Sequence, residues 1–134
     1  IQELKISMLA ANIDRSMLCL KQLVAGTPYS TQKKENFVFE EHFRFILKNI
    51  FYLCGFKVSE EQQMSAGRID LVVETSENIY ILELKMSDGG VVSASHQISS
   101  RHYADAYAAS SKPVISLALE FDRQSRGLMD WKML

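Results

Sequence analysis

Two carboxylates stand in the two most hydrophobic stretches of the chain. Asp70 lies in GRIDLVVE and Glu83 lies in IYILELK, where Lys85 follows two residues later. Carboxylate oxygens suit hard cations such as Mg²⁺ and Mn²⁺, which keep several waters and use few protein ligands. A neighbouring lysine can orient a water and stabilise charge on a phosphoryl oxygen. One interpretation of these residues is therefore a cation site that acts on a phosphate.

A hairpin would bring the two acids together. Residues 68–74 and 79–85 read as strands, and the polar TSEN between them reads as a turn. A two-residue loop and a four-residue loop give the same pairing of the strands. On one face this register pairs apolar residues throughout, Val73 with Tyr80, Leu71 with Leu82 and Ile69 with Leu84. That face is predicted to be the core side of the hairpin.

The other face of the predicted hairpin carries the charges. Asp70 stands opposite Glu83 there, with Cβ atoms about 5 Å apart, and two like charges at that distance repel by roughly 3 kcal/mol at an effective dielectric near 20. A raised pKa, the neighbouring Lys85 and Arg68, or a bound cation could compensate. A ladder of charges on a solvated sheet face is the alternative to a cation site, and the pattern by itself leaves both open.

The remaining segments predict an α/β domain. Residues 1–25 are expected to be helical, and residues 27–36 to form a polar linker. Further helices are expected at 39–55 and 91–110, and further strands at 56–63 and 113–121. The first segment should end at Gly26. Residues 122–134 read as a tail that docks through Leu128, Trp131 and Leu134. The element order after the linker is helix, three strands, helix, strand.

The helix expected at 39–55 carries an acid of ambiguous role. Its apolar stripe consists of Phe43, Ile46, Leu47, Ile50, Phe51 and Cys54, and Gly55 closes it. Glu40 lies three residues before Phe43 and seven before Leu47, which places it along the buried stripe. A glutamate in a first helical turn also favours the helix dipole. Both interpretations of Glu40 remain open.

Composition excludes several classes of protein. The 134 residues suit one domain, and a net charge of −1 with a pI near 6.3 argues against non-specific coating of nucleic acid. We see no apolar run long enough to span a membrane and no secretory signal. Cys19 and Cys54 are expected to be buried free thiols in a reducing cytoplasm. The histidines His42, His96 and His102 fit no zinc spacing.

With these residues in place, the chain resembles the PD-(D/E)XK nuclease superfamily, whose pattern is D-x(n)-E-x-K. It is most similar to the nuclease-like domain that follows an AAA-ATPase-like region in many bacterial proteins. The resemblance covers about residues 36–131 and is carried by Glu40, GRID (67–70), IYILELK (79–85), QISSRHYADAY (97–107) and FDRQSR (121–126). Ile69 replaces the proline that names the superfamily, and Arg101 stands where a lysine is usual.

The resemblance implies a restriction-endonuclease-like αβββαβ core, with a mixed central sheet flanked by helices and extra N-terminal helices. Residues 31–134 would form the nuclease-like domain and residues 1–30 a helical connector or appendage after an upstream ATPase-like domain. It also implies Mg²⁺- or Mn²⁺-dependent hydrolysis of DNA, or else a non-catalytic module that binds DNA or docks on the ATPase-like domain. The metal ligands would be Asp70, Glu83, the Leu84 carbonyl and Glu40, and the catalytic residues Asp70, Glu83, Lys85, Glu40 and Gln97. A homodimer is left open.

Overall fold

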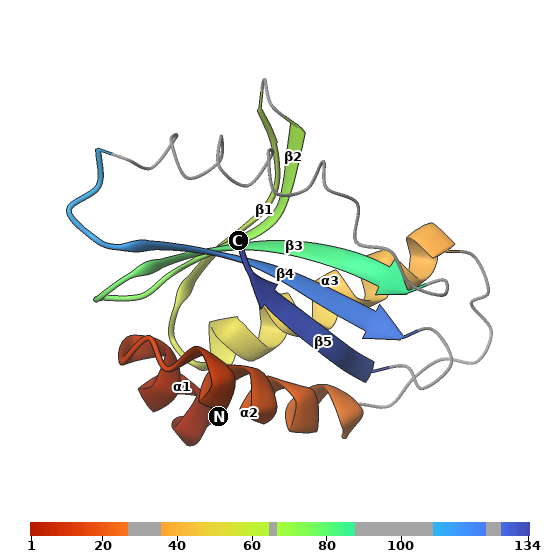
Figure 1. The fold of residues 1–134 in the computed structure, drawn as a ribbon, viewed down its shortest axis with the longest axis horizontal. Helices are drawn as coiled ribbons and strands as arrows, with labels where there is room; N and C mark the ends of the chain where they lie inside the picture. The colour runs from red at the N-terminus through yellow and green to blue at the C-terminus, as the bar shows by residue number, and fades with distance from the viewer. Residues whose placement is uncertain (27–35, 65–66, 88–108, 123–126) are drawn as a thin grey trace.

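A computed structural model describes residues 1–26, 36–64, 67–87, 109–122 and 127–134, without the side chains of 36–40, 61–64, 67–69 and 87. Three helices lie along one face of a five-stranded sheet (Figure 1). The elements are α1 Gln2–Leu9, α2 Ile13–Ala25, α3 Asn36–Leu53, β1 Lys57–Met64, β2 Gly67–Glu74, β3 Ile79–Ser87, β4 Val114–Asp122 and β5 Gly127–Met133. The α/β class is thereby confirmed. The helix expected at 91–110 falls almost entirely outside the described residues.

The N-terminal segment forms two helices, which agrees with the helical character expected of residues 1–25. Ala11 has a φ of 56°, which breaks the α-helical path between α1 and α2. Asn12 then caps α2, because its side chain accepts a hydrogen bond from the Arg15 N–H at 3.4 Å. The predicted end of α2 at Gly26 is confirmed.

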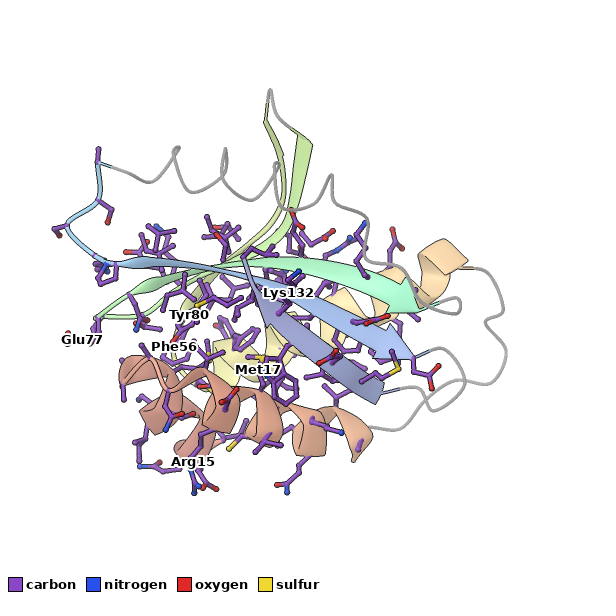
Figure 2. All side chains as sticks on the ribbon, in the orientation of Figure 1. Arg15, Met17, Phe56, Glu77, Tyr80 and Lys132 are labelled. Atoms are coloured by element: carbon purple, nitrogen blue, oxygen red, sulfur yellow. The ribbon has the colours of Figure 1, made fainter. Side chains whose placement is uncertain are left out.

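Helix α3 buries the stripe that its periodicity predicted. Its apolar residues Phe43, Ile46, Leu47, Ile50, Phe51 and Cys54 are all 8% exposed or less. Gly55 follows with a φ of 83°, a left-handed conformation that a residue without Cβ adopts readily, and it turns the chain into β1. The stripe packs on the same core as Leu4 and Met8 of α1 and as Met17, Leu20 and Val24 of α2. Met17, Phe56 and Tyr80 lie in this layer between helices and sheet (Figure 2).

Two buried hydrogen bonds fasten α1 to the sheet. The Met8 carbonyl accepts from the Tyr80 hydroxyl at 2.7 Å and from Asn78 Nδ2 at 3.0 Å. Asn78 and Tyr80 come from the turn end of the β2–β3 hairpin, so two hairpin side chains donate to one carbonyl near the C-terminal end of α1. The N-terminal helices therefore share a core with α3 and the sheet. The predicted boundary at residue 30 remains a prediction.

The sheet is mixed, with strand order β1-β2-β3-β4-β5. Strands β3 and β4 are parallel, and the other neighbours are antiparallel. The register of β2 and β3 confirms the predicted pairing from Leu71↔Leu82 to Glu74↔Ile79. The expected tail instead forms β5 beside β4, with Leu128 buried and Trp131 half-buried. The tail prediction missed this strand because its outer residues alternate poorly between apolar and polar.

The two faces of the sheet bury different groups. One face belongs to the main core, and the other carries a smaller cluster of Val72, Ile79 and Ile81 with the partly buried Val114. Asp70 and Glu83 each lie two residues from a member of this smaller cluster, and side chains alternate along a strand. The acids therefore lie on the face opposite α1 and α2. Within the part of the chain described, no helix is long and apolar enough to cross a membrane.

Candidate metal and catalytic site

The site lies where β2 separates from β3. Figure 1 shows β1 and β2 curving away together from the rest of the sheet, beyond the last pair of the described register, Leu71↔Leu82. At this point the Asp70 side chain still reaches β3, because its Oδ2 accepts a hydrogen bond from the Leu84 N–H at 2.9 Å. The carboxylate thus takes the place that a main-chain carbonyl of β2 fills in a regular ladder.

Both acids of the site are buried. Asp70 is 5% exposed and Glu83 is 3% exposed. The alternative of a charge ladder on a solvated face is therefore wrong, since solvation would leave these carboxylates open to water. A buried carboxylate is costly unless it is paired or hydrogen-bonded, and two on neighbouring strands also repel each other. Positive charge and hydrogen-bond donors nearby stabilise such an arrangement.

One compensating charge comes from α3. The Arg44 side chain is buried, and its Nη1 lies 3.9 Å from Asp70 Oδ1. Its Nη2 lies 3.6 Å from Glu41 Oε1, at the exposed surface of the helix. The guanidinium thus connects a surface carboxylate to a buried one. Asp70 is approached from two sides, by a main-chain N–H of β3 and by a cation of α3.

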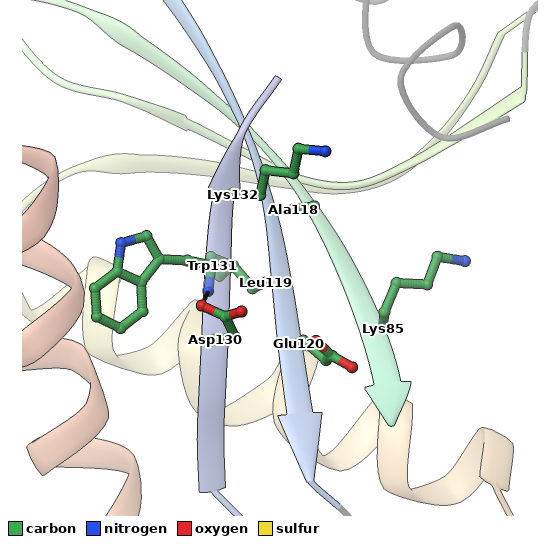
Figure 3. A pocket seen from close by; sticks show the side chains of 7 residues that line it. All are labelled: Lys85, Ala118, Leu119, Glu120, Asp130, Trp131 and Lys132. Atoms are coloured by element: carbon green, nitrogen blue, oxygen red, sulfur yellow. Dashed lines mark hydrogen bonds between the residues drawn. The ribbon is translucent and has the colours of Figure 1, made fainter. Parts of the chain in front are cut away.

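Lys85 is half-buried on the same face as Glu83 and lies at the edge of a small pocket. The parallel register places Lys85 beside Glu120 of β4, and the next strand places Glu120 beside Asp130. Figure 3 shows these three side chains in a row across β3, β4 and β5, with Lys132 on the neighbouring rung. Ala118 lies between Glu83 and Lys132 in the register. Its small side chain lines the pocket and leaves space there.

The structure places some of the other predicted residues and leaves two outside the description. Glu40 lies in α3, but helix α3 begins at Asn36, so no acid stands in its first turn. The helix-dipole interpretation of Glu40 is therefore wrong, and its approach to the metal stays a prediction because its side chain is not described. Gln97 lies outside the described residues. The Leu84 carbonyl remains a predicted ligand.

The donors present suit a hard divalent cation. Two carboxylates supply oxygen ligands only, and Mg²⁺ or Mn²⁺ completes its shell with waters. Across the described ranges, no group of three or more His, Cys, Asp and Glu side chains is placed to hold a metal ion. Burial lowers the pKa of the His42 imidazole in α3.

Sequence reasoning missed Arg44 and the polar residues of the pocket. Arg44 follows Glu40 by four residues and precedes Leu47 by three, so the rule that placed Glu40 on the buried stripe would have placed Arg44 there too. Glu120 and Lys132 could not have been found this way, because their neighbours are set by a parallel register and by a strand that the sequence pattern did not indicate.

Comparison with known proteins agrees with the geometry. Residues 38–131 match the model of the PD-(D/E)XK nuclease superfamily. The five-stranded mixed sheet with its helices accords with the restriction-endonuclease-like fold of that superfamily. A protein of Azotobacter chroococcum mcd 1, described as an uncharacterized protein in the vnfD 5′ region, is 30% identical over 92 residues. The match covers 68% of this chain but 18% of that relative.

Proposed function

Because this chain belongs to the PD-(D/E)XK nuclease superfamily, we propose that it is a metal-dependent nuclease that hydrolyses phosphodiester bonds in DNA. Nucleases of this superfamily generally use divalent metal ions. The observation that carries the proposal is the pair of buried carboxylates Asp70 and Glu83, with the half-buried Lys85 two residues along the same strand. In phosphodiester hydrolysis, paired acids can hold the metal ion while the lysine orients the attacking water.

Each residue of the proposed site has its own task. Asp70, Glu83, the Leu84 carbonyl and Glu40 hold Mg²⁺ or Mn²⁺, which supplies Lewis-acid polarisation of the scissile phosphate when bound. Lys85 orients the attacking water and stabilises the charge that develops on a phosphoryl oxygen. Gln97 is assigned a role near the reacting phosphate only through the resemblance to the superfamily. The bond between phosphorus and one ester oxygen breaks. The oxygen of water joins phosphorus, and a proton from water goes to the departing ester oxygen. The products carry one phosphomonoester end and one hydroxyl end.

Cleavage of supercoiled plasmid DNA in Mg²⁺ or Mn²⁺ tests this proposal. We expect Asp70→Ala and Lys85→Ala each to lower the rate by about a hundredfold or more, because each removes a group that acts on the transition state. Glu77→Ala and Lys21→Ala, at exposed positions of the hairpin turn and of α2, are matched charge controls and should cleave at the wild-type rate. Equal residual cleavage in wild type and both site variants would contradict nuclease activity.

Metal-dependent stability tests the cation site separately from catalysis. A ligand that binds the folded state raises the unfolding temperature by mass action. We expect MnCl₂ to stabilise the wild type in a thermal unfolding assay and to stabilise Glu83→Ala far less. If Glu83→Ala responds to Mn²⁺ as the wild type does, the cation is not held at Glu83.

A non-catalytic module that binds DNA or docks on an associated ATPase-like domain is the second candidate. Its support is electrostatic: Glu120 lies beside Lys85 in the register, Asp130 lies beside Glu120, and the net charge of the chain is −1. These acids repel a polyanion at the pocket, so they favour docking on an ATPase-like domain over binding of DNA. Stable Mn²⁺ binding without cleavage of double-stranded DNA, single-stranded DNA or RNA would favour this second function.

We further propose that the chain works as part of a longer polypeptide with an ATPase-like domain upstream. The length of the relative, of which this chain covers 18%, supports the longer polypeptide, and the ATPase-like domain rests on the resemblance described above. In that arrangement residues 1–30 connect the ATPase-like domain to the nuclease-like domain of residues 31–134. Whether two copies associate is open to measurement by light scattering.

A further inference from the structure

Arg44 is a buried cation that the proposed reaction does not use. Arginine is almost never fully buried unless it is paired. Here its guanidinium lies between Asp70 Oδ1, at 3.9 Å from Nη1, and Glu41 Oε1, at 3.6 Å from Nη2. The neighbouring Phe43 and Leu47 belong to the apolar core. A charged side chain in this position has a cost that its partners must offset.

The partner inside the protein is the carboxylate that the proposed function assigns to the metal. Asp70 is 5% exposed, and its other oxygen accepts the Leu84 N–H at 2.9 Å. Glu83 on the next strand is 3% exposed. Two buried negative charges therefore need positive charge nearby, and Arg44 supplies it from the protein itself.

A divalent cation at Asp70 and Glu83 would meet the same need. Arg44 and the cation would then both attract the Asp70 carboxylate and would repel each other. Each therefore reduces the stabilisation that the other gives to the site. We propose that Arg44 is a positioning residue that balances the charge of the site before metal binds, and that it thereby weakens the affinity of the site for metal. This inference rests on the proposed function.

Variants of Arg44 test the inference through metal binding rather than through cleavage. We expect Arg44→Gln to unfold at a lower temperature without metal, to bind Mn²⁺ about five- to tenfold more tightly in calorimetric titration, and to gain more stability from Mn²⁺ than the wild type. Arg44→Lys keeps the positive charge and should bind Mn²⁺ nearly as the wild type does. Arg15→Gln, which breaks the exposed Arg15–Glu3 pair, is the matched control and should leave Mn²⁺ binding unchanged.

Each other outcome overturns the inference. An equal loss of stability with and without Mn²⁺, at unchanged affinity, would make Arg44 a packing residue only. Weaker Mn²⁺ binding by Arg44→Gln would make it an aid to metal binding instead. If Arg44→Gln is unfolded without metal, Mn²⁺ must restore the circular dichroism of the folded chain, and failure to do so overturns the inference.

Failure of the inference differs from failure of the proposed function. If the wild type binds Mn²⁺, Asp70→Asn does not, and Arg44→Gln binds as the wild type does, then only the role of Arg44 is wrong. If the wild type itself binds no Mn²⁺, the metal-dependent function and the role of Arg44 fall together.

Discussion

At the turn end of the β2–β3 hairpin, the buried side chains of Thr75 and Asn78 form hydrogen bonds with neutral groups, whereas at the other end the buried side chains are charged. Thr75 and Asn78 are each 3% exposed at the turn. The Asn78 N–H donates to Thr75 Oγ1 at 2.9 Å, and the Thr75 N–H donates to the Asn78 carbonyl at 2.9 Å. Asn78 Nδ2 also donates to Met8 of α1. Most of these bonds are local, and none depends on a bound ion.

At the separating end of the hairpin, Asp70 and Glu83 are buried to a similar degree, but the groups are charged. Their balance depends on Arg44 from α3 and on the Leu84 N–H of β3. A charged site responds to an added cation, and a network of neutral hydrogen bonds does not. One end of the hairpin thus stabilises the fold and the other carries the candidate site, with cross-strand pairs of apolar residues (the apolar rungs) between them.

The largest effect is expected when an apolar rung between the two ends is removed. Leu71 is fully buried and pairs with Leu82 in the main core. Leu71→Ala should lower the free energy of unfolding by about 2–5 kcal/mol, because it removes buried methyl groups and leaves a cavity. Urea unfolding measures this loss. The exposed Leu18→Ala should cost less than about 0.5 kcal/mol, and a loss at Leu71 as small as that would contradict the role of the rung.

A moderate effect is expected at the turn end, where Tyr80 joins α1 to the sheet. Burial raises the pKa of Tyr80 to about 12, against a smaller lowering by its hydrogen bond with Asn78. Tyr80→Phe should cost about 1 kcal/mol, since the Met8 carbonyl keeps Asn78 as a donor.

The pH dependence of Tyr80 has a defined sign. A raised pKa in the folded state favours the neutral hydroxyl, so this stability is complete below pH 10 and is lost as pH rises toward 12. Thermal unfolding between pH 9 and 12 should show this alkaline loss in the wild type and a smaller one in Tyr80→Phe. Mn²⁺ binding should not change in Tyr80→Phe, and a changed affinity would show that the two ends are coupled.

The smallest effect is expected from a charged pair beside the turn. Lys112 Nζ donates to Glu74 Oε2 at 2.7 Å and to the Thr75 carbonyl at 2.9 Å, but both side chains of the pair are partly exposed. The hydrogen bond from Lys112 lowers the pKa of Glu74 below its ordinary value of 4.5. The contribution of the pair is thus present above that value and is lost as pH falls through the lowered pKa.

Lys112→Met should therefore cost about 0.5 kcal/mol or less at pH 7, because solvent screens the pair. Thermal unfolding between pH 7 and 3 should show a less steep acid loss in Lys112→Met and in Glu74→Gln than in the wild type. Identical acid profiles in all three proteins would mean that the pair contributes nothing to stability.

Much of the architecture follows from local pattern. The stripe of α3, the end of α2 at Gly26 and the pairing of Leu71 with Leu82 were all predictable, because period and turn position act over a few residues. The break at Ala11 was not, because alanine seldom adopts the positive φ that separates α1 from α2 there. The strand β5 was also missed, because it pairs with β4 along one edge and alternates weakly.

The candidate site divides in the same way. Alternation along paired strands is enough to place Asp70, Glu83 and Lys85 on one face of a hairpin. The folded chain adds that the acids are buried, that Asp70 accepts a hydrogen bond from the Leu84 N–H, and that Arg44 of α3 lies beside Asp70. Burial and long-range charge pairing depend on which elements pack together, and no local spacing specifies that. Because the packing of the elements buries Asp70 and Glu83, their negative charge must be balanced by groups such as Arg44.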